Sequence, residues 1–321
     1  MLGNPLGDPT LRRVPIYLPP DYDESKRYPT VYLLAPFGSR GLKMLADELW
    51  EDNIQERLDR LILSNSMRPM IAVMPDASTR YGGSEYVNSS ATGNYEDHVL
   101  ELVEFIDQRY PTLADADHRA VAGHSSGGFA ATRFGMRHPN LFGLIADHSG
   151  DKYFELTYKT SFPHLLSYFV RHGEEGFARL LKDPGAELQK GAPFQALSVA
   201  AVAACFSPNP KAPHGFDLPF DLHTGELIPE VWERWLAFDP VEIVENYSKE
   251  LRSLRLLFFD CGLFDEYNLL YGARIFDNRL KALDIPHTYE EFEGGHRHIR
   301  YRFDTSLKAI SQAMPQTERT S

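Results

Sequence analysis

Stretches typical of strands alternate with stretches typical of helices over both ends of the chain. Short runs rich in apolar, β-branched and aromatic residues predict strands over residues 13–18, 30–34, 70–74, 119–123, 142–147, 254–260 and 287–292. Apolar residues at roughly helical spacing predict helices over residues 42–63, 95–110 and 129–137. Parallel strands need crossover connections, which helices normally supply. This order predicts an α/β fold, with a mostly parallel sheet and helices on both of its faces.

The alternation stops between Gly150 and Leu254. Residues 174–181 and 194–205 have helical patterns, a proline-rich stretch follows at 207–219, and no strand is predicted. A long insertion between two core strands commonly covers the functional edge of a sheet. We therefore expect one domain over residues 1–321, with residues 151–253 forming a helical cap.

Composition restricts the partners that the chain can have. The sequence has 33 Lys and Arg against 45 Asp and Glu, a net charge of −12, which disfavours nucleic acid and anionic membrane surfaces. Only Cys205 and Cys261 occur, and the first ten residues lack the apolar core of a secretory signal, so we expect a cytoplasmic protein. No apolar run reaches the roughly 18 residues of a membrane span. A homo-oligomer is compatible with this composition.

One pentapeptide carries the strongest chemical signal. Gly123-His124-Ser125-Ser126-Gly127 fits the pattern G-x-S-x-G and lies between a predicted strand and a predicted helix. A serine on such a tight turn needs very small neighbours two residues away on each side, which Gly123 and Gly127 provide. We expect Ser125 to be a nucleophile, with the backbone N–H of Ser126 facing a developing oxyanion. The loop after residues 30–34 would supply the second N–H, from Phe37 with Gly38 as the alternative, because Pro36 has none.

A nucleophilic serine needs a base, and the base needs an acid to orient it. Asp265 and His296 each follow a predicted strand, and the order Ser, Asp, His is that of an α/β-hydrolase triad. Asp260 and Glu266 compete with Asp265 for the acid role, and His298 competes with His296 for the base role.

Other polar residues carry weaker predictions. His296 and His298 could together ligate a metal, but no third ligand is evident, so no metal is expected. No phosphate-binding loop or cysteine cluster occurs either, so we expect no cofactor. His124, beside the nucleophile, and Arg274 are candidate substrate-binding residues, although a salt bridge to nearby acids is the ordinary interpretation for Arg274.

The chain resembles the esterase D family of α/β-hydrolase-fold serine esterases, which includes feruloyl esterases and S-formylglutathione hydrolases. The resemblance rests on residues 14–22, 28–34, 73–77, 123–128, Gly262 with Asp265, and 294–296. It implies a triad of Ser125, Asp265 and His296, with Phe37 and Ser126 as the oxyanion donors.

These observations predict a serine hydrolase that cleaves carboxylic esters through an acyl-enzyme intermediate, with a small-molecule ester as substrate and without a cofactor. An acyltransferase to a sugar or another alcohol would use the same three residues. Because Ala35 and Pro36 replace the His-Gly or Asp-Gly found in many relatives, a non-catalytic binding protein on the same fold is a further alternative.

Overall fold

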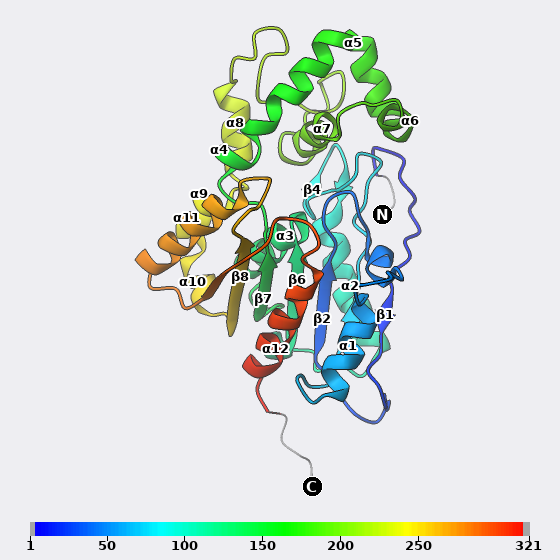
Figure 1. Cartoon of the computed structure of the whole chain (residues 1–321), viewed down its shortest axis with the longest axis vertical. Coiled ribbons are helices and arrows are strands. Elements are labelled where there is room, and N and C mark those ends of the chain that lie inside the picture. The colour runs from blue at the N-terminus through cyan, green and yellow to red at the C-terminus, as the bar shows by residue number, and fades with distance from the viewer. Residues whose placement is uncertain (1–3, 317–321) are drawn as a thin grey trace.

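In the computed structural model, which describes residues 4–316, seven strands form one sheet in the order β1-β3-β2-β6-β7-β8-β9 (Figure 1). The strands are β1 (Ile16–Tyr17), β2 (Thr30–Leu34), β3 (Ile71–Val73), β6 (Arg119–His124), β7 (Leu144–His148), β8 (Leu256–Gly262) and β9 (Thr288–Phe292). Only β1 is antiparallel to its neighbour. The carboxyl ends of β2, β6, β7, β8 and β9 therefore meet at one edge, where open α/β sheets bind ligands.

The two faces of the sheet are covered by different helices. In β2, Tyr32 and Leu34 point to one apolar cluster and Val31 and Leu33 to another, as strand geometry requires. The first cluster contains residues of α2 (Tyr95–Arg109), α3 (Ser126–Arg137), α9 (Pro240–Ile243), α10 (Ser248–Arg252) and α11 (Leu269–Ala282). The second contains residues of α1 (Ile54–Leu63) and α12 (Phe303–Ala313). Both faces are thus buried, which explains why apolar residues do not simply alternate with polar ones along the central strands.

A third group of helices, the cap helices, lies beyond the carboxyl edge of the sheet at the top of Figure 1. The cap helices are α4 (Phe154–Thr157), α5 (Phe162–Lys182), α6 (Pro184–Gln189), α7 (Phe194–Phe206) and α8 (Pro229–Leu236). They share an apolar cluster that includes the buried side chains of Phe206, Trp232 and Trp235. The last part of the segment between β7 and β8 does not belong to the cap helices. Its helices α9 and α10 pack beside the sheet, against α11 and α3.

Short elements complete the described chain. They are the hairpin β4 (Asn88–Ser89) and β5 (Gly93–Asn94), and the 3₁₀ helices Gly41–Leu45, Ala116–His118, Lys159–Ser161, Val244–Tyr247 and Arg300–Arg302.

The helix predicted over residues 42–63 is wrong in its first half. The structure has a 3₁₀ turn at Gly41–Leu45, and α1 begins only at Ile54. The Asn53 side chain accepts the N–H of Glu56 at 3.1 Å, and the Glu56 carboxylate accepts the N–H of Asn53 at 2.8 Å. This reciprocal capping box starts the helix at a fixed position, which the spacing of apolar residues alone does not show.

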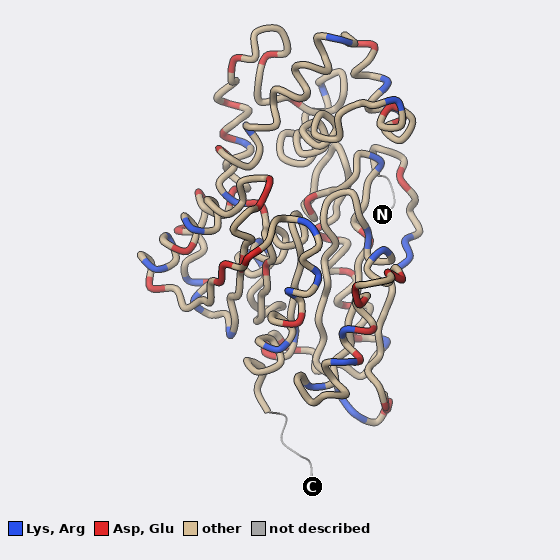
Figure 2. The backbone as a smooth tube through the Cα atoms, in the orientation of Figure 1, with Lys and Arg blue, Asp and Glu red and all other residues tan. Residues whose placement is uncertain are grey.

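Charged residues of both signs are intermixed along the sheet, its flanking helices and the cap helices (Figure 2). Among residues 4–316, no helix has the length and apolar character needed to cross a bilayer.

Candidate active site

Ser125 occupies a sharp turn between β6 and α3. Its backbone has φ 57° and ψ −124°, in the left-handed half of conformational space that side chains rarely adopt. A Cβ on Gly123 would overlap the backbone of Gly127, and a Cβ on Gly127 would overlap the carbonyl of Leu34. The two glycines are therefore required by close backbone contacts, as the sequence pattern predicts, and the turn directs the Ser125 hydroxyl above the sheet edge.

His296 and Asp265 lie in hydrogen-bonding order behind this serine. His296 Nε2 is 2.9 Å from Ser125 Oγ, and its Nδ1 is 2.8 Å from Asp265 Oδ2. The other carboxylate oxygen of Asp265 accepts the N–H of Tyr267 at 2.9 Å, and its side chain is fully buried. The histidine ring is thus held on one side by a fixed acceptor, while its other nitrogen can accept the serine proton.

The competing acids have other partners. Asp260 is bonded to His148 Nδ1 at 2.9 Å and to Arg302 Nε at 2.8 Å, within a buried network below the site. Glu266 accepts the backbone N–H of His296 at 2.6 Å, so it positions the histidine main chain and does not bond to its ring. Only Asp265 of the three carboxylates bonds to the His296 ring among the described residues.

His298, the competing base, and Arg274, a candidate substrate-binding residue, both lie outside the site. His298 is exposed and has φ 58°. Arg274 forms a two-bonded ion pair with Glu291, at 2.8 Å for each bond, on the exposed side of α11. The structure does not bring either residue to Ser125. Among residues 4–316, no group of three or more His, Cys, Asp or Glu side chains is arranged to hold a metal.

Two backbone N–H groups close to Ser125 have no backbone acceptor among the described residues. Ser126 is the first residue of α3, so its N–H has no acceptor within the helix. In the loop after β2, the N–H of Gly38 donates to the carbonyl of Gly82 at 3.3 Å and that of Ser39 donates to the carbonyl of Pro36 at 3.1 Å, whereas the N–H of Phe37 has no such acceptor. The Phe37 ring lies against Gly82 and Gly83, where any Cβ would overlap it. This packing fixes the loop despite Ala35 and Pro36 in place of the residues common in relatives.

A cavity of about 320 Å³ opens in front of the serine, between the sheet edge and the cap helices. It is lined by Ser125 and His296, by Phe37 from the loop after β2, and by residues of α7 that include Phe194 and Ser198. The rings of Phe37 and Phe194 meet edge to face with centroids 5.6 Å apart. The size falls within the usual range for small-molecule sites.

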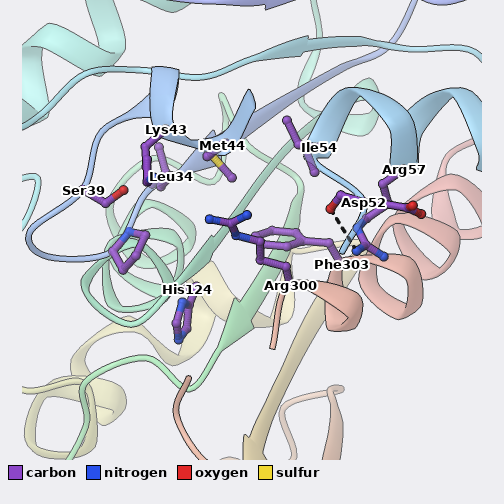
Figure 3. A pocket seen from close by; sticks show the side chains of 11 residues that line it. Leu34, Ser39, Lys43, Met44, Asp52, Ile54, Arg57, His124, Arg300 and Phe303 are labelled. Atoms are coloured by element: carbon purple, nitrogen blue, oxygen red, sulfur yellow. Dashed lines mark hydrogen bonds between the residues drawn. The ribbon is translucent and has the colours of Figure 1, made fainter. Parts of the chain in front are cut away.

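His124 lines this cavity, as predicted, and also forms a wall of a second one. The second cavity, of about 70 Å³, is lined by Lys43, Arg57, Arg300 and Phe303 (Figure 3). The His124 ring lies 4.7 Å from that of His296. Burial, followed by the charge of His296, lowers the pKa of His124 well below its usual range, so His124 is neutral at pH 7. His124 therefore contributes an uncharged wall beside the His296 ring.

The comparison with known families agrees with this geometry. The sequence model of the family described as "Putative esterase" matches residues 9–314, nearly the whole chain. The chain belongs to this esterase family. Its likeness to curated members is moderate: an esterase of Mycobacterium tuberculosis is 27% identical over 301 residues, covering 88% of this chain and 52% of the relative. This family member thus spans about half the length of the curated relatives it matches first.

Solved structures place the esterase-family chain in one fold. A ferulic acid esterase aligns with a TM-score of 0.60 at 20% identity, covering 94% of this chain and 92% of that one. An S-formylglutathione hydrolase from Staphylococcus aureus aligns with a TM-score of 0.54 at 18% identity, with coverages of 94% and 92%. The esterase-family chain therefore has the α/β-hydrolase fold, as its alternating strands and helices predict.

Several residues that line the cavity in front of Ser125 were missed by the sequence reasoning, and three of them have ionisable side chains close to the sheet edge or the cap. Glu85 lies in the loop between β3 and β4, Asp151 follows β7, and Tyr158 belongs to the cap segment, yet all three line the cavity. Asp151 had a usable signal, because it follows a strand at the same sheet edge as Asp265. Glu85 and Tyr158 had none, because no sequence pattern brings their segments together.

Proposed function

We propose that the protein is a serine hydrolase that cleaves carboxylic esters in two steps through an acyl-enzyme. The observation that carries this proposal is the chain of hydrogen bonds Ser125–His296–Asp265, at 2.9 and 2.8 Å, opening on a cavity of about 320 Å³. Membership of an esterase family supports the same reaction class. These bonds suit a resting enzyme in which the His296 ring is neutral. Its Nδ1 proton then points to Asp265, and its Nε2 is free to accept the Ser125 proton.

In the proposed first step, Ser125 Oγ attacks the ester carbonyl while His296 Nε2 takes its proton. The imidazolium that forms lies against the Asp265 carboxylate, which stabilises its charge. The N–H groups of Phe37 and Ser126 would bond the tetrahedral oxyanion more strongly than the ground-state carbonyl. His296 then gives its proton to the leaving alcohol, and the acyl group stays on Ser125.

In the second step, water takes the place of the alcohol. His296 removes a proton from the water as it attacks the acyl carbon, and returns the proton to Ser125 Oγ as the carboxylic acid leaves. The same groups act in reverse order, so a single histidine serves as base and acid in each half of the reaction.

The test uses a fluorophosphonate probe, which phosphonylates activated serines, together with turnover of p-nitrophenyl acetate. Intact mass should show one adduct on the wild type and none on Ser125→Ala, with kcat lowered by about 10⁴-fold or more in the variant. The exposed Ser66, replaced by Ala, is the control and should keep both the adduct and the turnover. A folded wild type without an adduct, or full turnover by Ser125→Ala, would contradict the proposal.

A further inference from the structure

Two acidic side chains lie inside the cavity although the proposed reaction uses neither. Glu85 is 2% exposed and Asp151 is 9% exposed, and both line the cavity that holds Ser125 and His296. They come from separate segments, the loop after β3 and the residue three positions beyond the end of β7. Carboxylates are rarely buried unless they are paired, so this placement calls for a partner.

Glu85 has an oxygen without a partner. Within residues 4–316, Glu85 Oε2 is buried and makes no hydrogen bond. Glu85 and Tyr86 both have left-handed backbones, with φ 50° and 52°, which holds the Glu85 side chain in place. A buried polar atom without a bond is costly in a folded protein. Because Oε2 is itself closed to solvent, a ligand reaches it only when the Glu85 carboxyl turns toward the cavity that this residue lines.

The groups around the pair do not neutralise both acids. Glu85 faces Asp151, the phenol of Tyr158, the Cys205 thiol and Tyr86. Asp151 faces the His296 ring, the Lys152 ammonium and the acids Asp147 and Asp265. However, Lys152 Nζ is already 2.5 Å from Asp147 Oδ2.

Burial and the neighbouring charges shift the pKa values of both acids. Burial and then the Asp151 charge raise the pKa of Glu85 well above its usual range, and burial raises the pKa of Asp151 to about 6. Glu85 therefore holds its proton more readily than an ordinary carboxyl, so the two acids together carry less than two full negative charges at neutral pH and retain acceptor oxygens.

We propose that Glu85 and Asp151 bind a hydrogen-bond-donating group, a hydroxyl or an ammonium, on an arm of the ester substrate away from the reacting carbonyl. The proposal rests on the proposed function of the same cavity. Neutral polar side chains of the cap segment, among them Thr157, Ser161, Gln195 and Ser198, line the same cavity and suit a polar arm. A carboxylate or phosphate arm placed against Glu85 and Asp151 would meet like charge and is disfavoured there, although the cavity lining also includes Arg297.

Esters of matched size test the proposal. The acyl series is methyl heptanoate, methyl 6-hydroxyhexanoate and methyl 6-aminohexanoate, which end in a methyl, a hydroxyl and an ammonium. The alcohol series is heptyl, 6-hydroxyhexyl and 6-aminohexyl acetate. In at least one series, wild-type kcat/KM should be about tenfold or more higher for a donor-bearing ester than for the methyl-terminated one. The responding series identifies the arm, and the responding group separates hydroxyl from ammonium.

Glu85→Gln and Asp151→Asn should each reduce the ratio of kcat/KM for the donor-bearing ester to that for the methyl-terminated ester about tenfold, chiefly through the KM of the donor-bearing ester. The control Glu104→Gln removes the same charge from the exposed side of α2 and should leave the preference unchanged. Thermal unfolding checks that each variant is folded, and Asp151→Asn carries the test if Glu85→Gln fails to fold.

The possible failures are distinguishable. Turnover of methyl-terminated esters with no donor preference in the wild type, or with a preference that survives both variants, would overturn the inference and leave the proposed function intact. Absence of turnover for every ester, with no fluorophosphonate adduct, would reject the proposed function and the inference with it.

Discussion

Ser125 is held in an uncommon backbone conformation by its surroundings. A non-glycine residue in a sparsely populated region costs on the order of 1–3 kcal/mol, so other contacts must hold it there. Its N–H donates to the carbonyl of His148 at 2.9 Å, and its carbonyl accepts the N–H of Phe129 at 2.9 Å. The first bond ties the turn to β7 and the second to the first turn of α3. The position of the hydroxyl is thus fixed by the sheet and a helix before any substrate arrives.

Asp265 and Asp260 make a matched pair for testing which carboxylate serves His296. Asp265→Asn should lower kcat about 10⁴-fold with little loss of stability, because the amide disturbs the orientation and charge of the histidine. Asp260→Asn should instead lower the free energy of unfolding by about 3 kcal/mol, because it breaks a buried network with His148 and Arg302. Its kcat per folded molecule should remain near that of the wild type. Ester kinetics and urea unfolding separate the two effects, and the reverse assignment would follow if Asp260→Asn alone lost kcat.

At the scale of elements, helices α2 and α3 are joined by a buried ionic contact. Glu96, in the first turn of α2, bonds to Arg137 Nε at 2.8 Å and to His138 Nε2 at 2.6 Å, at the end of α3. Burial alone would raise the pKa of Glu96, but the bonds from His138 and Arg137 lower it to about 2. A carboxylate with a lowered pKa stabilises the folded chain at neutral pH.

Glu96→Gln should therefore lower the free energy of unfolding at pH 7 by about 3 kcal/mol. Because the folded-state pKa is lowered, this contribution is complete above the unfolded pKa of about 4.3 and is lost as the pH falls toward about 2. Urea unfolding of both proteins between pH 7 and pH 3 should show the difference shrinking below about pH 4. Glu101→Gln, an exposed change on the same helix, is the control. A difference that does not change over this range would contradict the assigned contact.

Sequence patterns predicted elements best where packing and periodicity agree. The strand at residues 30–34 matches β2, and the helix at 95–110 matches α2 to within one residue, because one face of each repeats regularly. The predicted helix was wrong at residues 46–53, because hydrogen bonds at Asn53, and not the spacing of apolar residues, decide where α1 begins. The positions of Ser125, Asp265 and His296 were predictable because each follows a strand of one parallel sheet. Glu85 was not predictable, since its place depends on two left-handed residues and on a distant cap segment.

At the scale of the whole molecule, the cavity is completed only when the cap helices meet the sheet edge. The sheet contributes Ser125 and His296, and the cap segment contributes Tyr158, Phe194 and Ser198. The proposed chemistry then needs only backbone N–H donors and one hydrogen-bonded histidine, and no described cluster of ligands is arranged for a metal.

Exhaustive dialysis against EDTA should leave ester turnover unchanged. In the proposed mechanism the N–H groups of Phe37 and Ser126 polarise the ester carbonyl, which is the role of the metal ion in metal-dependent hydrolases. Turnover is measured before dialysis, after dialysis, and after addition of Zn²⁺, with a zinc esterase treated in parallel. A loss that Zn²⁺ restores would contradict this prediction and favour a site that includes His296 and His298.

The cap helices enter the fold as one uninterrupted stretch of sequence, between two strands that are neighbours in the sheet. Asp239, just after the last cap helix, accepts the N–H groups of Tyr153 and Phe154 at the start of the first one, so both ends of this stretch lie at nearly the same place. The sheet can therefore form its hydrogen bonds whatever the inserted stretch contains. Under the proposed function, much of the wall around the substrate is encoded in this single block, whereas the proposed reacting residues Ser125, Asp265 and His296 lie outside it. Exchange or lengthening of that block can change which substrate such a protein accepts, while the sheet edge with its proposed reacting residues is retained.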